Sequence, residues 1–240
     1  MFKKTSYWIL SKSPYYSFIF IIPFLIIYEF MVLFLSRNEV STLRNGADIL
    51  LRQFMSLFGD IGLYIISTSF FLIFLIIFLL QKKNINETSI KSKYLLFMLF
   101  EGLIWGIVLY FFMLFSQTLL MFPTSKELIS QIILSIGAGL YEELVFRVLL
   151  IMFLTKLIKI IFLWNYLICL LVSMTLSAIV FSYFHFLGPY GDPLSFSVFI
   201  YRFLGGFFLG FLYILRGFGI TAYAHINYNL IIIFFLTTNE

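Results

Sequence analysis

Seven long apolar segments constrain the fold of this chain more than any other feature. A helix needs about 20 apolar residues to cross the hydrocarbon core of a bilayer, and in an open chain only a helix satisfies its own backbone hydrogen bonds there. The segments are 15–35, 61–80, 94–115, 128–154, 160–187, 195–215 and 220–236. We therefore predict an all-α polytopic membrane helix bundle with about seven transmembrane helices (six to eight), forming a single integral membrane domain over residues 1–240.

The composition excludes the main alternatives to a membrane protein. Of the 240 residues, 62% are hydrophobic and 11% are charged, whereas a soluble domain carries about 25% charged residues. A soluble globular protein and a disordered chain are therefore excluded. The basic residues lie scattered between apolar segments and form no basic face, so a nucleic-acid partner is excluded as well. With Cys169 as the single cysteine, the chain forms no internal disulfide and no cysteine-based metal cluster.

The distribution of basic residues predicts an orientation in the membrane. With seven spans, most Lys and Arg residues of the connections fall on the side of the N-terminus, among them Lys3, Lys4 and Arg216. This bias favours a cytoplasmic N-terminus in a multi-pass protein of the cell membrane. The segment 15–35 has no small-residue cleavage site, so we expect a retained anchor. We expect residues 48–58 to form an interfacial helix or part of an eighth span, which would invert the topology after it.

Ionisable side chains inside the spans are the candidates for function, because each costs about 2.5–3.5 kcal/mol on insertion scales. Three of them, Glu142, Glu143 and Arg147, lie within six residues of one predicted helix. Glu143 and Arg147 are four residues apart and share a face, so we expect an ion pair that fixes this helix. Glu142 is rotated by about 100° from Glu143 and points toward a different neighbour. We expect it to act as a base that takes a proton from water near neutral pH.

The two histidines of the chain lie in two other predicted spans. His185 ends the segment 160–187, and His225 shares a helix face with Asn229, four residues further on. An imidazole and a carboxamide opposite a carboxylate can hold a water and stabilise an oxyanion. Both histidines can instead join Glu142 as ligands of one divalent metal such as zinc, with a water in the open position. The sequence leaves open whether the site has no metal or one.

The remaining polar residues and glycine pairs of the spans match no catalytic pattern. We expect Glu29 and Glu101 to be satisfied buried carboxyls or cavity-lining groups. Arg202 is expected to snorkel to the interface or to pair with one of them. The pairs Gly102-x-x-x-Gly106 and Gly206-x-x-x-Gly210 predict close packing of helices.

Three motifs of the second half together resemble those of a known family. They lie on separate predicted helices, in the order Glu142-Glu143-x-x-x-Arg147, Phe181-x-x-x-His185 and His225-x-x-x-Asn229. This ordered set resembles the CPBP family of intramembrane proteases, which includes CAAX prenyl proteases, bacteriocin-processing proteins and abortive-infection proteins. The resemblance covers roughly residues 125–236, where we expect the protease core.

The resemblance implies an enzyme, an intramembrane endopeptidase that cleaves a membrane-associated, prenylated or peptide substrate. It implies that Glu142 activates the attacking water and that His185 helps to hold this water. It further implies that His225 and Asn229 stabilise the oxyanion. The expected partners are a peptide or protein substrate in the membrane and the lipid bilayer itself, and no nucleic acid.

The resemblance also implies that Glu143 and Arg147 support their helix. Val148 stands where many members have a glycine after the motif arginine, which concerns local packing. The same residues fit a non-enzymatic membrane protein on this scaffold, such as a bacteriocin self-immunity or partner-binding factor. They fit a small transporter less well, because the two halves of the sequence show no inverted repeat and no matched Pro-interrupted helices.

Overall fold

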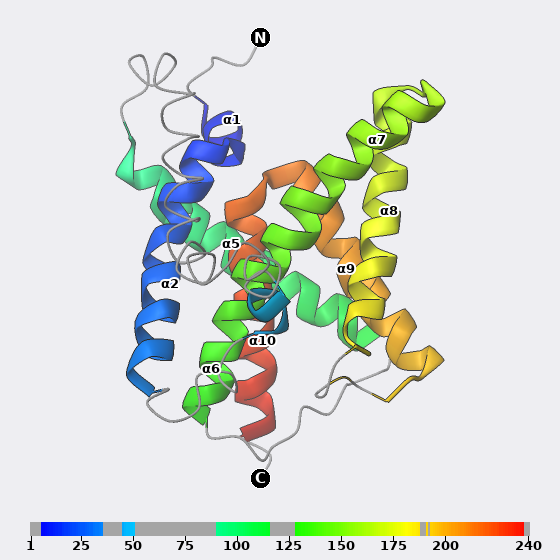
Figure 1. Ribbon diagram of the computed structural model, residues 1–240. Coiled ribbons are helices and arrows are strands. Elements are labelled where there is room, and N and C mark those ends of the chain that lie inside the picture. Colours follow the sequence, from blue (N-terminus) through cyan, green and yellow to red (C-terminus); the bar gives the residue numbers. More distant parts are fainter. Residues whose placement is uncertain are drawn as a thin grey trace, which may run out of the picture.

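The structure is a computed structural model that describes residues 6–35, 45–50, 90–115, 128–187, 191 and 193–237, and within these ranges all regular secondary structure is helical (Figure 1). The predicted span 61–80 and residues 51–58 of the predicted interfacial segment lie outside the described residues.

Five long helices form the frame of the bundle. They are α2 (Pro14–Leu35), α5 (Ser92–Phe115), α8 (Tyr166–Phe184), α9 (Phe196–Arg216) and α10 (Phe218–Thr237). Each contains a stretch that is long and apolar enough to cross a membrane. They coincide closely with the predicted segments 15–35, 94–115, 195–215 and 220–236, and with the later part of 160–187. The predicted all-α polytopic bundle is confirmed.

The predicted helix 128–154 is longer than expected and continues without a break to residue 162. It comprises α6 (Leu128–Gly137), the π-helix η1 (Ala138–Ile151) and α7 (Met152–Phe162). The chain turns at Leu163, which has a φ of 55°. The predicted boundary at 154–160 is wrong because the lysines there lie exposed on α7, whereas Thr155 and Ile158 on the same helix are buried.

The core of the bundle is the contact of α10 with α5, η1 and α2. Figure 1 shows α10, in red, running through the middle of the molecule, with α2 on one side and the α8–α9 pair on the other. The α7–α8 hairpin extends away from this centre. Because α10 lies against η1, His225 of α10 can reach Glu143 of η1 inside the bundle.

The glycine pairs predicted to pack helices do so. A Cβ atom added at Gly102 would lie 2.6 Å from the Tyr223 ring, which places α5 directly against α10. At Gly210 it would lie 2.8 Å from the Met174 side chain, which places α9 against α8. The small residues thus permit the close approach of helix backbones that a membrane bundle uses for packing.

Two neighbouring glycines of α9 offer a matched test of this packing. A Cβ atom at Gly206 would lie 2.7 Å from Cδ1 of Phe181, whereas at Gly205 its nearest contact is 3.5 Å from the flexible Met113. We expect Gly206→Ala to lower the free energy of unfolding by about 1–3 kcal/mol through overpacking. Gly205→Ala is expected to be neutral or to stabilise by up to about 1 kcal/mol, because alanine favours the helix. Equilibrium unfolding of both variants in detergent measures the difference, and equal effects would contradict the packing described here.

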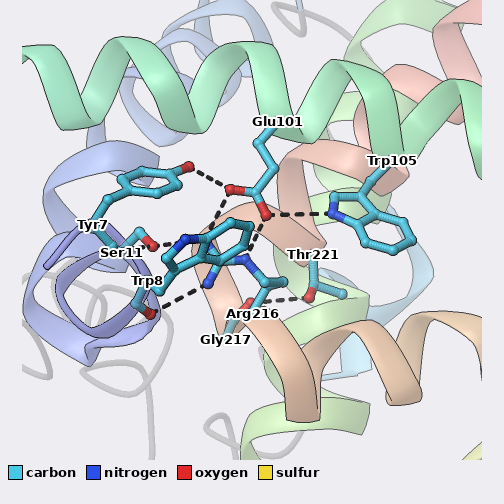
Figure 2. Close-up of polar contacts among 8 residues, drawn as sticks. All are labelled: Tyr7, Trp8, Ser11, Glu101, Trp105, Arg216, Gly217 and Thr221. Carbon is cyan, nitrogen blue, oxygen red and sulfur yellow. Dashed lines mark hydrogen bonds and ion pairs between the residues drawn. The ribbon is translucent and has the colours of Figure 1, made fainter. Parts of the chain in front are cut away.

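A short helix at the N-terminus, α1 (Tyr7–Lys12), was not predicted and packs against α5, α9 and α10. It closes a polar cluster around Glu101 of α5 (Figure 2). The Glu101 carboxylate accepts hydrogen bonds from the Tyr7 hydroxyl, from Trp105 Nε1 at 3.4 Å and from Arg216 Nη2 at 2.8 Å. Glu101 is therefore a satisfied carboxyl, as expected.

Arg216 completes this cluster and corrects one prediction. It was assigned to a cytoplasmic connection, but it is the last residue of α9 and only 5% exposed. Its Nη2 donates to Ser11 Oγ at 2.8 Å, its Nη1 donates to the Trp8 carbonyl at 3.3 Å, and the guanidinium lies 4.3 Å from the Trp8 ring (Figure 2). Burial and then the Glu101 carboxylate raise the pKa of Tyr7 above its ordinary value, so the phenol remains a donor. Arg216 is therefore not a charge of a loop. Its ion pair with Glu101 and its hydrogen bonds to Trp8 and Ser11 connect the end of α9 to α5 and α1.

Candidate active site

The Glu-Glu-Arg motif lies in η1, the wider-wound part of the long helix. The hydrogen bonds of a π-helix, which join residue i to residue i+5, are rare in proteins. Where they occur, they are often found at functional sites. Glu142, Glu143 and Arg147 are 5%, 0% and 1% exposed, so all three are buried. A Cβ atom at Gly139 would lie 2.4 Å from Ile226 Cγ1, which shows how closely α10 approaches η1. This approach brings the histidine of α10 to the motif.

Glu143 contacts two basic side chains, one from its own helix and one from α10. Its Oε2 lies 3.0 Å from Arg147 Nε, and its Oε1 lies 2.9 Å from His225 Nδ1. The predicted pair of Glu143 with Arg147 is thus present, as an ion pair whose N–H is not aligned for a hydrogen bond. Arg147 is further held by the Gly206 carbonyl, which accepts from Nη2 at 3.3 Å, and its guanidinium lies 4.4 Å from the centre of the Phe181 ring.

The contact between Glu143 and His225 determines which protonation state of the imidazole can serve as a donor. When Nδ1–H donates to the carboxylate, the neutral ring carries its lone pair on Nε2. To donate to an oxyanion from Nε2, the ring must therefore carry a proton on both nitrogens. The sequence predicts His225 as an oxyanion donor, and the structure adds Glu143 as the partner of its other ring nitrogen.

Glu142 points away from this triad, as the rotation between adjacent helical residues predicted. Its Oε1 accepts a hydrogen bond from Asn45 Nδ2 at 3.0 Å, and both residues are buried. Asn45 is not among the predicted site residues, because it ends the polar stretch 36–45 between two apolar segments, a pattern typical of a connection. Its only signal in the sequence is its place in Asn45-Gly46-Ala47-Asp48. There, an amide (Asn45) and a carboxyl (Asp48) stand at the point where the polar stretch meets the next apolar segment.

The remaining predicted site residues lie around Phe181 and along α10. His185 follows the last residue of α8, and its Nδ1 lies 2.8 Å from the Phe181 carbonyl oxygen. The Phe181 ring lies 4.7 Å from the His185 ring and 6.5 Å from the His225 ring, so it is near both imidazoles. Asn229 is half-buried on α10, and its side chain makes no hydrogen bond to another residue of the described ranges.

The metal hypothesis was tested against the same side chains. Within the ranges that the structure describes, no three His, Cys, Asp or Glu side chains lie together in an arrangement that could hold a metal ion. The nearest carboxylate to His225 already pairs with Arg147, and His185 faces a backbone carbonyl. These residues do not fit the three-ligand site of a catalytic zinc, so no step below passes through a metal.

An apolar cavity of about 690 Å³ lies next to the candidate residues. Its walls are formed by η1 and α7, by the end of α8 and by residues 47 and 50. Phe146, Phe184 and Ala47 belong to the lining, and each lies within four residues of Glu142, His185 or Asn45. The cavity can take an apolar group but offers almost no polar partner.

The comparison with protein families now identifies the second half of the chain. Residues 124–231 match the model described as type II CAAX prenyl endopeptidase Rce1-like. Over these residues the chain is similar to the CAAX-protease (CPBP) family. This CAAX-protease segment contains all six predicted site residues, whereas Asn45 and the helices α1, α2 and α5 lie outside it. No curated protein and no solved structure matches the chain significantly. Residues 124–231 are thus similar to a protease family, and five of the described helices are long and apolar enough to cross a membrane.

Proposed function

We propose that the protein is an intramembrane endopeptidase that hydrolyses a peptide bond of a membrane-associated, prenylated or peptide substrate. One observation carries the proposal: the buried carboxylate of Glu142 lies in the same turn of η1 as the Glu143–His225 pair, within the CAAX-protease segment. Peptide hydrolysis by water requires a general base and a donor that stabilises the oxyanion. Glu142 and the His225 side chain paired with Glu143 offer these two groups.

The proposed reaction uses the side chains in separate roles. Glu142 takes a proton from a water molecule, whose oxygen attacks the carbonyl carbon of the scissile bond. His225, as the imidazolium held by Glu143, and the Asn229 amide donate to the oxyanion that forms. His185 accepts a hydrogen bond from the water through Nε2, because its Nδ1 faces the Phe181 carbonyl. The C–N bond then breaks, and the proton passes from Glu142 to the leaving amine.

The arrangement in the membrane is part of the proposal. We propose that residues 125–236 form the protease core within one membrane domain over residues 1–240. Arg147 contacts α9 and Glu143 contacts α10, so the two residues hold η1 in place against these helices. The loop charges support a multi-pass protein of the cell membrane with a cytoplasmic N-terminus.

Proteolysis of candidate substrates in reconstituted membranes tests the proposed function. The substrates are a prenylated peptide with a CAAX terminus, the same peptide without the prenyl group, and membrane proteins of the host. The wild type is expected to cleave at least one of them, and Glu142→Ala and His225→Ala are each expected to cleave it about 100-fold more slowly or worse. Undiminished cleavage by both variants would overturn the proposal.

Removal of metal ions gives a separate prediction. Because the described residues hold no three-ligand metal site, we expect the peptidase activity to survive prolonged treatment with EDTA. The initial rate after chelation and dialysis is compared with the untreated rate, and both are expected to agree within about twofold, far less than the loss that follows removal of a catalytic metal's activated water. An activity that disappears on chelation and returns with zinc would contradict this prediction.

A further inference from the structure

We propose that Asn45 is a positioning residue for the catalytic base, which fixes one carboxylate oxygen of Glu142 and leaves the other to take the proton from water. The inference rests on the proposed function. It assigns a role in the reaction to the N-terminal half of the chain, which lies outside the segment that matches the CAAX-protease family.

The contact itself is direct and buried. Asn45 Nδ2 donates to Glu142 Oε1 at 3.0 Å, and the exposed fractions of Asn45 and Glu142 are 9% and 5%. Hydrogen bonds to an ionised group are about twice as strong as neutral ones, and more so away from water. The donor therefore restrains both the rotation of the carboxylate and the choice of the oxygen that faces the substrate.

The amide of Asn45 is held in the orientation that this contact needs. Its Oδ1 accepts a hydrogen bond from the Ala47 backbone N–H at 2.9 Å, so its Nδ2 is the group that faces Glu142. The backbone N–H of Asn45 donates to the Tyr28 hydroxyl at 3.2 Å. Tyr28 in turn donates to Asp48 Oδ2 at 3.0 Å, and both of these residues are 0% exposed. Residues 45–48, at the start of the helical stretch 46–50, are thus held by three hydrogen bonds next to the base.

Helix α2 also anchors the residue that precedes Glu142 in η1. The Tyr141 hydroxyl donates to Glu29 Oε1 at 2.6 Å, and the rings of Tyr141 and Tyr28 lie 5.4 Å apart. A Cβ atom at Gly137 would lie 2.5 Å from the Tyr28 ring, so α6 also packs closely on α2. The residue before Glu142 and the residue that contacts Glu142 are therefore both anchored to α2. A base positioned to within a fraction of an ångström needs such support from rigid elements.

Replacement of Asn45 tests the role by kinetics. Asn45→Ala removes the donor and is expected to lower kcat by about 10- to 100-fold with little change in KM, because a base displaced by about 1 Å loses rate on this scale. Asn45→Asp keeps the shape but places a second carboxylate against Glu142, so its kcat is expected to fall at least as far. Asn45→Gln keeps the amide donor and is expected to recover part of the rate lost in Asn45→Ala.

The matched control is Asn165→Ala. Asn165 also uses its side-chain oxygen in a local turn, accepting from the Leu167 N–H at 2.9 Å, but it lies exposed at the start of α8. Its kcat is expected to stay within about twofold of the wild type, because truncation of an exposed cap acts on stability. All rates are divided by the amount of folded protein, measured by thermal unfolding in detergent, so that a loss of folding is not counted as a loss of catalysis.

The outcomes separate this inference from the proposed function. If Glu142→Gln is inactive and Asn45→Ala retains the wild-type kcat per folded molecule, the positioning role is overturned and the proposed function stands. The same holds if Asn45→Gln is no better than Asn45→Ala, because the role then does not depend on the amide donor. If Glu142→Gln is itself fully active, the proposed function is overturned, and the positioning role of Asn45 is overturned with it.

Discussion

Replacement of Glu142 by glutamine is expected to lower kcat for peptide hydrolysis by about 100-fold or more, with a small change in KM. Glutamine keeps the size of the side chain and can still meet Asn45, but it cannot accept a proton from water. The effect falls on kcat because the lost interaction exists only in the transition state. Initial rates over a range of substrate concentrations in liposomes give both constants.

Glu101→Gln is the matched control for this experiment. Glu101 is also a carboxyl inside a span, but it lies in the cluster with Arg216 and Tyr7, outside the site. Its replacement is expected to reduce the amount of folded protein, because it leaves the buried Arg216 without a charged partner. The kcat per folded molecule is expected to remain within about threefold of the wild type, since Glu101 makes no contact in the proposed reaction. Equal losses of kcat in both variants would mean that any buried carboxyl matters, and would remove the special role of Glu142.

The second large effect concerns stability and comes from Glu143. Glu143→Leu leaves Arg147, which is 1% exposed, without its ion-pair partner and leaves His225 without its acceptor. Breaking one side of a buried ion pair typically costs about 3–5 kcal/mol, because the remaining charge is buried and uncompensated. We expect this loss in equilibrium unfolding in detergent, together with loss of peptidase activity.

A double variant distinguishes this electrostatic cause from a simple packing defect. Glu143→Leu combined with Arg147→Met removes both charges, and an apolar pair of similar volume often matches a buried ion pair in stability. The double variant is therefore expected to be more stable than Glu143→Leu alone, although it remains inactive. Losses that add up from the two single variants would show that the two residues do not interact.

The arrangement of Glu142, Glu143 and Arg147 could be predicted because these three residues share a helix. The pairing of Glu143 with Arg147 followed from their spacing, and it holds even though η1 is wound more widely than an α-helix. In an i to i+5 helix, residues four apart still lie near one face. The different direction of Glu142, toward another neighbour, followed from the same periodicity. Local geometry was sufficient wherever both partners lay within one turn.

Contacts between distant segments were beyond such reasoning. Asn45 meets Glu142 across 97 positions of the chain, and Arg216 meets Glu101 across 115. In the sequence, Asn45 ended a polar connection, and Arg216 preceded Gly217 at the end of an apolar segment, so both fitted the pattern of loop residues. Their burial depends on where α1, α2 and α5 pack, and periodicity within a single helix contains no information on that.

The end of α7 shows a further limit of sequence patterns. Lys156 and Lys159 suggested a connection, but they are exposed residues of a continuous helix. The chain turns only at Leu163, without the help of a Gly or Pro. The turn is formed by Leu163 itself, in the left-handed conformation, and by Asn165, which caps α8. A leucine with positive φ is uncommon, so tertiary packing and not local preference determines this boundary.

The most direct test of the central claim compares protein termini in membranes that contain the wild type, Glu142→Ala or His225→Ala. Mass spectrometry of all new N- and C-termini requires no prior choice of substrate. The account predicts a set of termini that appears with the wild type and is absent, or reduced about 100-fold, with either variant. Identical sets of termini in all three membranes would contradict it, and would favour a non-enzymatic protein on the CAAX-protease scaffold.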